Sequence, residues 1–241
     1  MLDNERIVHL REEQMDNTSS AAGHHSLNLE MAPGGVVVFY SDGERPQDWI
    51  IEMLVASASI APAELMEEVM ADSRCPAFGP IHHFVVGATL LACRRNAEVA
   101  TDREDKLRAD LEEMLARSSG VPGATCARWG VCGAAASAGM AYSIVRGNAP
   151  LREEGWQEGQ LMVSDLLARI ARSGAPRCCK RDSRVAVAAA MAHFNALGGP
   201  QMAESDAMPT CASSGQNGAC MGSGCPYYPG RKQCGRSWPA R

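Results

Sequence analysis

The strongest constraint on the fold is a series of helical patterns that covers residues 46–198. Apolar residues there recur at the spacing of an amphipathic helix, most clearly at Leu107, Leu111 and Leu115, where charged residues occupy the other face. Strand-like sequence is confined to the run 36–40. The sequence therefore predicts an all-α fold, a single compact bundle of roughly six or seven helices.

Three regions follow from this pattern. Residues 1–45 mix small, polar and charged side chains, and we expect a flexible arm that carries one short strand. Residues 46–198 form the helical domain. Residues 199–241 are rich in glycine and cysteine and lack an apolar face, so we expect an irregular tail that is ordered only through its cysteines.

Composition narrows the classes of function. A chain of 241 residues, 46% hydrophobic, can bury a substantial core without covalent cross-links. A formal net charge of −5 indicates no basic surface, and we expect no nucleic-acid partner. The chain contains no phosphate-binding loop, no dinucleotide-binding glycine motif, no H-E-x-x-H and no G-x-S-x-G, which leaves nucleotide-driven and standard hydrolase chemistry without support.

The location of the protein decides how its ten cysteines are interpreted. The first residues are polar and acidic, unlike a secretory signal, and the apolar segments are too short to span a bilayer. We expect a cytoplasmic protein with no membrane contact. Because cytoplasmic thiols are kept reduced, the cysteines point to metal binding or redox chemistry more than to disulfides.

Cys126 and Cys132 precede a stretch rich in alanine, glycine and serine. Nearby glycines predict a turn and then a helix that begins near Cys132, where backbone N–H groups favour a thiolate. This position suits a reactive or metal-ligating cysteine. The alternative is that both residues are small buried hydrophobic side chains.

Cys178 and Cys179 are adjacent, which disfavours a disulfide between them, because neighbouring Cα atoms are only about 3.8 Å apart. Arg177, Lys180 and Arg181 flank the pair and would stabilise thiolates. The doublet therefore predicts a soft-metal ligand or a sulfur nucleophile, the alternative being a chance pair at a helix start.

Two further groups offer ligands. His82 and His83 follow each other at a predicted helix start, where one imidazole can face the interior as a ligand or as an ordinary core histidine. The tail spaces its four cysteines as C-x8-C-x4-C-x8-C, at Cys211, Cys220, Cys225 and Cys234. Four thiolates in a glycine-rich segment can wrap one ion, either zinc or the iron of an iron–sulfur cluster.

Several stretches together resemble an uncharacterised bacterial and archaeal family, the DUF5714-type domain. They are GPIHHFVVGATLLACRRN, GVPGATCARWGVCGAAASAGMAYSIVRGNAPL, GAPRCCKRDS and the closing cysteines with CPYY. Members of the family occur alone or joined to methyltransferase-like or radical-SAM domains, which implies a partner enzyme of that type. The resemblance marks these positions: His82, His83, Asn96, Cys126, Trp129, Cys132, Cys178, Cys179, Lys180, Arg181, Cys211, Cys220 and Cys225. It leaves out Cys75, Cys93 and Cys234, so the three marked tail cysteines would need a fourth ligand from the body.

Two hypotheses follow. In the first, the protein binds a soft metal ion such as zinc, or an iron–sulfur cluster, and is accessory to a redox, sulfur-handling, metal-handling or methyl-transfer system. In the second, it is a thiol-dependent oxidoreductase or transferase with Cys132 or Cys179 as the catalytic nucleophile. Lys180, Arg181 and Trp129 would contact a cofactor. The predicted metal ligands are His82, His83, Cys126, Cys132, Cys178, Cys179, Cys211, Cys220 and Cys225, and the four body cysteines are expected to converge near an imidazole.

Overall fold

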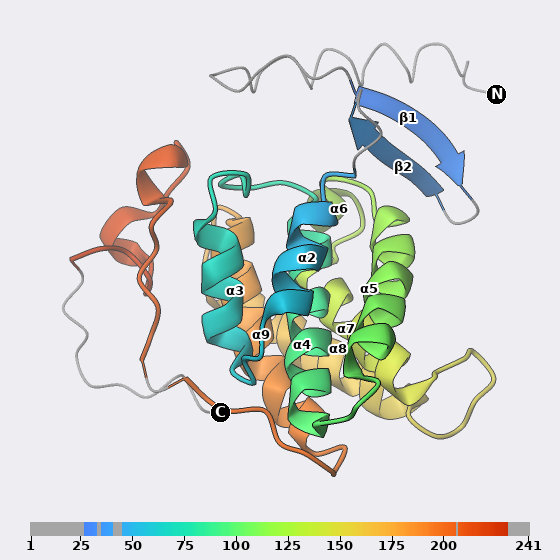
Figure 1. Ribbon diagram of the computed structural model, residues 1–241. Coiled ribbons are helices and arrows are strands. Elements are labelled where there is room, and N and C mark those ends of the chain that lie inside the picture. The colour runs from blue at the N-terminus through green and yellow to red at the C-terminus, as the bar shows by residue number, and fades with distance from the viewer. Residues whose placement is uncertain (1–26, 33–34, 41–44, 206, 231–241) are drawn as a thin grey trace.

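A computed structural model describes residues 27–32, 35–40, 45–205 and 207–230. Eight α-helices among these residues pack into one body, which confirms the predicted all-α bundle (Figure 1). Their bounds are α2 Asp48–Ala56, α3 Pro62–Ala71, α4 His82–Glu98, α5 Arg103–Ser119, α6 Thr125–Arg128, α7 Gly133–Arg146, α8 Trp156–Arg172 and α9 Cys179–Asn195.

Three helices differ from the sequence patterns, which predict the last two helices of the body over residues 151–173 and 184–197. The short helix α6 was not predicted. Helix α8 starts at Trp156 and not at Leu151, because Gly155 has a left-handed φ of 85° that a continuing helix does not allow. Helix α9 starts at Cys179 and not at Arg184, because the charged residues of its first turns are buried and bonded inside the fold.

A hairpin precedes the helical body. Strand β1 (Leu27–Ala32) pairs antiparallel with β2 (Gly35–Tyr40), and Leu27 lies opposite Tyr40. Strand β2 covers the run in which a strand was expected, while β1 was not anticipated. Residues 1–26, for which a flexible arm was predicted, lie outside the described residues.

Helix α4 is the centre of the bundle, with most of its residues buried. It lies very close to α7, since the backbone N–H of Gly87 donates to the Ser137 hydroxyl at 2.8 Å. A Cβ at Gly87 would overlap the Met114 side chain of α5. The small residues of α7 and of mid-α4 therefore serve close helix packing.

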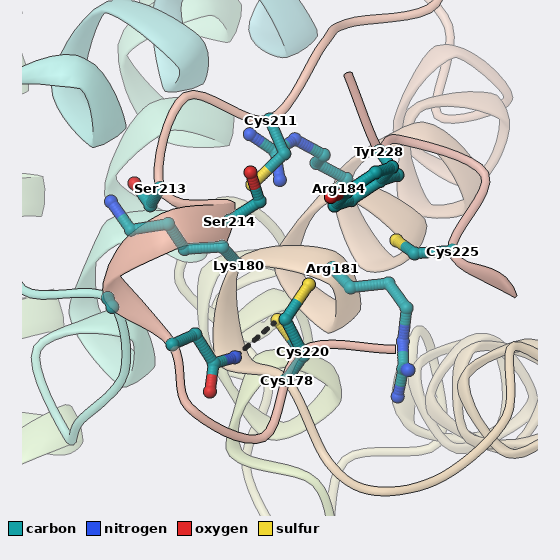
Figure 2. Close-up of a pocket in the computed structure, with 12 residues that line it drawn as sticks. Cys178, Lys180, Arg181, Arg184, Cys211, Ser213, Ser214, Cys220, Cys225 and Tyr228 are labelled. Atoms are coloured by element: carbon teal, nitrogen blue, oxygen red, sulfur yellow. Dashed lines mark hydrogen bonds between the residues drawn. The ribbon is translucent and has the colours of Figure 1, made fainter. Parts of the chain in front are cut away.

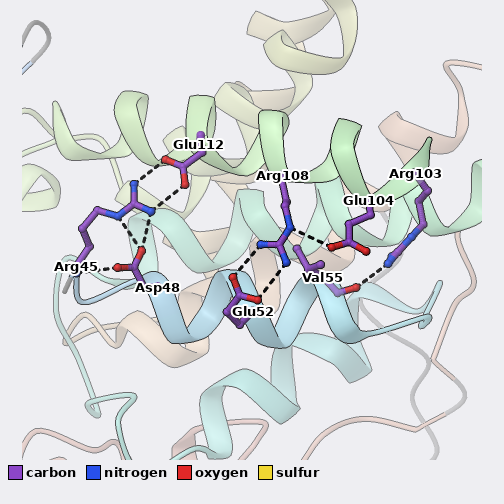
Figure 3. A network of polar contacts seen from close by, with 8 residues as sticks. All are labelled: Arg45, Asp48, Glu52, Val55, Arg103, Glu104, Arg108 and Glu112. Carbon is purple, nitrogen blue, oxygen red and sulfur yellow. Dashed lines mark hydrogen bonds and ion pairs between the residues drawn. The ribbon is translucent and has the colours of Figure 1, made fainter.

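Helix α2 is joined to α5 by ion pairs along their shared edge (Figure 3). Arg45 donates to Glu112 at 2.6 Å, and Arg108 donates to Glu52 at 2.8 Å. Exposed ion pairs of this kind contribute little to the free energy of folding, so their main effect is to orient α2 relative to α5.

The tail returns along the body after α9. The guanidinium of Arg94 donates to the carbonyls of Pro200 and Gly198, and the Ala203 N–H donates to the Ile60 carbonyl at 2.8 Å. The described tail has little regular structure beyond two 3-10 turns, Ser214–Gln216 and Gly222–Gly224. Within the described residues, none of the helices combines the length and apolar character that a membrane span requires.

Candidate metal-binding site

The tail folds over the start of α9 and encloses a small pocket between itself and the body (Figure 2). Four cysteines line this pocket, three from the tail and one from the residue that precedes α9: Cys211, Cys220, Cys225 and Cys178. The cavity has a volume of about 20 Å³, which is room for one water-sized particle. The structure thus brings the three marked tail cysteines to one cysteine of the body.

Contacts on both sides hold the tail in this position. The guanidinium of Arg184 lies 5.2 Å from the centre of the Tyr227 ring and interacts with the Cys211 sulfur. The Cys211 N–H donates to the Tyr227 carbonyl at 2.7 Å, which ties the two ends of the tail loop together. The amide of Asn217 donates to the Cys178 sulfur at 3.8 Å.

Arg181 connects the pocket to three segments of the chain. It is 2% exposed, donates to the carbonyls of Gly174 and Pro176 at 2.6 and 3.1 Å, and also contacts the Met221 sulfur. An ion pair with Asp182 at 3.1 Å completes its partners. Arg181 was predicted to contact a cofactor. In the structure its N–H donors connect the tail residue Met221 and the carbonyls of Gly174 and Pro176 to α9.

Lys180 is 1% exposed and lines the same pocket. Its ammonium donates to the Met70 carbonyl at 2.6 Å and to the carbonyl and sulfur of Cys75 at 3.4 and 3.5 Å. In the described part of the chain, no ion pair joins Lys180 to a carboxylate, whereas Arg181 and Arg184 are paired with Asp182 and Glu67. Of the three buried cations in the pocket wall, Lys180 is therefore the one without a carboxylate partner among the described residues.

Other predicted residues stand at the starts of α4, α7 and α9. Cys132 directly precedes α7, and Cys179 opens α9. The ring of His83 lies against Gly133, where a Cβ would overlap it. The structure thus places His83 beside the start of α7, and of the four body cysteines that were expected to converge only Cys178 lines the pocket with the tail cysteines.

Burial has the largest effect on the pKa of these thiols and imidazoles. It raises the pKa of the Cys132 thiol to about 11, although the N–H groups of Ala134 and Ala135 act in the opposite direction. It also raises the pKa of the Cys179 and Cys225 thiols and lowers the pKa of His83. These cysteines are neutral thiols at pH 7 until a metal ion or a base removes the proton.

His82 has a buried ring that is 1% exposed. Its Nδ1 lies 3.1 Å from the Gly79 carbonyl and donates to it, so Nε2 carries a lone pair and has no hydrogen-bond partner among the described residues. Burial lowers the pKa of His82 to about 3. The neutral imidazole is the ligand form, and the positive charges of Lys180 and Arg184 lower its pKa in the same direction as burial does.

We expect His82 to make folding stability depend on pH. The folded protein holds the ring neutral with a pKa of about 3, while the unfolded chain protonates it near 6.5. The stabilisation is present above pH 6.5 and is lost as the pH falls toward 3, by up to about 1.4 kcal/mol per unit. Urea denaturation of the protein and of His82→Gln between these limits measures it. Equal pH slopes for the two would contradict the assignment.

The remaining predicted residues do not line the pocket. Cys126 is half-buried in α6, and Trp129, which follows that helix, is 60% exposed. Asn96 donates to the carbonyls of Ser57 and Ser59, a structural role. Cys75, at the Lys180 ammonium, was not among the predicted site residues, and only its position shortly before His82 in the sequence signalled it.

The cysteines of the described residues are free thiols, and no three histidine, cysteine, aspartate or glutamate side chains in that part of the chain are gathered closely enough to hold an ion. The fold and the pocket define an all-α, cysteine-rich protein with an irregular tail closed over buried thiols. The chain belongs to the Family of unknown function (DUF5714), whose family model matches residues 50–228. No curated protein and no solved structure matches it.

Proposed function

We propose that the protein binds one soft metal ion, zinc or an ion of similar character, through Cys178, Cys211, Cys220 and Cys225. The observation that carries this proposal is the pocket that these four cysteines line. Thiolate sulfur is the ligand type that selects zinc, copper(I) and iron–sulfur clusters. The small cavity favours a single ion over a cluster, which would need more room than one water-sized space.

The charges around the pocket support the same assignment. A divalent ion with four thiolates carries a net charge of about −2. Lys180 has no carboxylate partner in the described residues, and Arg184 interacts with the Cys211 sulfur directly. Buried cations of this kind offset the negative charge that the metal centre would bring into the protein.

Binding requires the tail to tighten, because the four sulfurs are not yet gathered at the spacing that an ion needs. Three of the four ligands lie on the tail, which is irregular and can adjust, while Cys178 is fixed at the start of α9. The ion would therefore draw the tail onto the body and add its binding free energy to the ordering of the tail.

We expect anaerobically purified protein to bind one equivalent of zinc or cobalt(II) and to protect its tail in doing so. Cobalt(II) in a four-thiolate site gives intense charge-transfer absorption, and limited proteolysis reports cleavage after residue 198. The proposal would be contradicted if the tail were cleaved at the same rate with and without metal, or if the reduced protein bound no metal. An absorption spectrum typical of iron–sulfur proteins would show that the site holds a cluster and not a single ion. The accessory role toward a partner enzyme stays a prediction.

A further inference from the structure

Asn217 lines the pocket and makes hydrogen bonds with three of its polar groups. Its side-chain Nδ2 donates to the Cys178 sulfur at 3.8 Å (Figure 2), and its Oδ1 accepts from the Ala219 N–H at 3.0 Å. Its backbone carbonyl accepts from the Cys220 N–H at 2.9 Å. Because Oδ1 is occupied by a backbone donor, the side-chain amide presents its N–H group to the sulfur.

These bonds join one cysteine of the body to one cysteine of the tail. Cys178 directly precedes α9, whereas Cys220 belongs to the tail. The Cys220 sulfur also accepts from the Gly222 N–H at 3.4 Å, in a turn where Gly222 has a left-handed φ of 57°. Asn217 and this turn therefore hold Cys178 and Cys220 as one half of the pocket.

The other half of the pocket is organised around Tyr227. The Cys211 N–H donates to the Tyr227 carbonyl at 2.7 Å, and Cys225 stands two residues before Tyr227 in the chain. The Tyr227 ring is buried, with the guanidinium of Arg184 5.2 Å from its centre. The pocket thus has two halves with separate supports, and Asn217 is the residue that joins body to tail in the first of them.

We infer, given the metal pocket proposed above, that Asn217 is its positioning residue. It orients the Cys178 sulfur and fixes the turn that carries Cys220. Its amide N–H can still donate to the Cys178 sulfur when an ion is bound there, and a hydrogen bond to a charged acceptor is stronger than one to a neutral group. Partners of this kind, which contact a ligand and not the ion, contribute about 10–100-fold to metal affinity.

The test compares Asn217→Asp with the unaltered full-length protein in a zinc competition titration. The carboxylate has the same shape and can still accept from the Ala219 N–H, but it has no N–H to donate to Cys178. We expect the zinc affinity to fall at least about tenfold. Gln216→Ala is the matched control, because Gln216 is an exposed amide one residue away that does not line the pocket, and its zinc affinity should be unchanged.

Cobalt(II) absorption separates the role of the N–H donor from a general effect on the tail. A donor lowers the energy of the sulfur lone pairs, so its loss should move the sulfur-to-cobalt charge-transfer bands to longer wavelength. We expect this shift at saturating cobalt(II) in Asn217→Asp and also in Asn217→Ala, which introduces no charge. A less ordered tail alone would lower the affinity and leave the bands of the saturated site in place. Circular dichroism shows whether each variant keeps its helices.

The inference is overturned if Asn217→Asp binds zinc as tightly as the unaltered protein, or if the cobalt(II) bands keep their wavelength in both Asn217 variants. Cys225→Ser, measured alongside, distinguishes this failure from failure of the metal pocket. If Cys225→Ser loses zinc while Asn217→Asp keeps it, the pocket stands and Asn217 has no positioning role. If the unaltered protein binds no zinc, the metal pocket is contradicted, and the role of Asn217 with it.

Discussion

Cys225→Ser is expected to lower the affinity for zinc by more than about 100-fold, beyond what loss of an outer-shell contact costs. Cys225 lines the pocket from the tail, and its thiol is buried and neutral until an ion displaces the proton. A serine hydroxyl does not replace a thiolate as a soft ligand. Competition titration with a colorimetric zinc chelator measures the change.

Cys178→Ser is expected to show the same loss, because it removes the one ligand that the body contributes. Cys126→Ser is the matched control, since Cys126 is half-buried in α6 and does not line the pocket. It should bind one equivalent with unchanged affinity. Full metal content in both pocket variants, or a loss in the Cys126 variant as large as theirs, would place the ion elsewhere in the protein.

Much of the helical body was predictable because an amphipathic helix buries one apolar face, and the spacing of its apolar residues shows in the sequence. Periodic apolar residues define α5 from the sequence alone. The apolar pattern of α9 shows only from Arg184 onward, because its first turn is made of charged residues. Lys180, Arg181 and Arg184 are nevertheless buried, because backbone carbonyls and Glu67 accept their hydrogen bonds.

The site was predictable in its residue types and not in its grouping. The tail spacing indicated thiolate ligands, and the family resemblance implied that the body supplies one of them, but neither could name Cys178. That assignment depends on the fold of the tail, which the contacts of Arg181 with Met221 and of Arg184 with Tyr227 hold against α9. The separation of Cys178 from Cys179 depends on one extended residue before a helix, which no spacing rule reveals.

Arg181→Leu is expected to destabilise the fold by about 3–5 kcal/mol. The change removes the donors that hold Gly174, Pro176 and Met221 together, and it leaves the carboxylate of Asp182 buried without its ion-pair partner. Urea denaturation followed by circular dichroism measures the free energy of unfolding. Limited proteolysis should also show earlier cleavage of the tail, because Met221 loses its contact with α9.

The control is Arg177→Leu, an exposed residue of the same type shortly before Arg181, which should change stability by no more than about 0.5 kcal/mol. The double variant Arg181→Leu, Asp182→Asn should recover part of the loss, because the unpaired buried charge is removed with its partner. If the free energy of unfolding of Arg181→Leu lies within about 1 kcal/mol of that of the unaltered protein, the buried guanidinium does not fasten the tail. The cysteine pocket would then depend on Arg184 and Tyr227 for its closure.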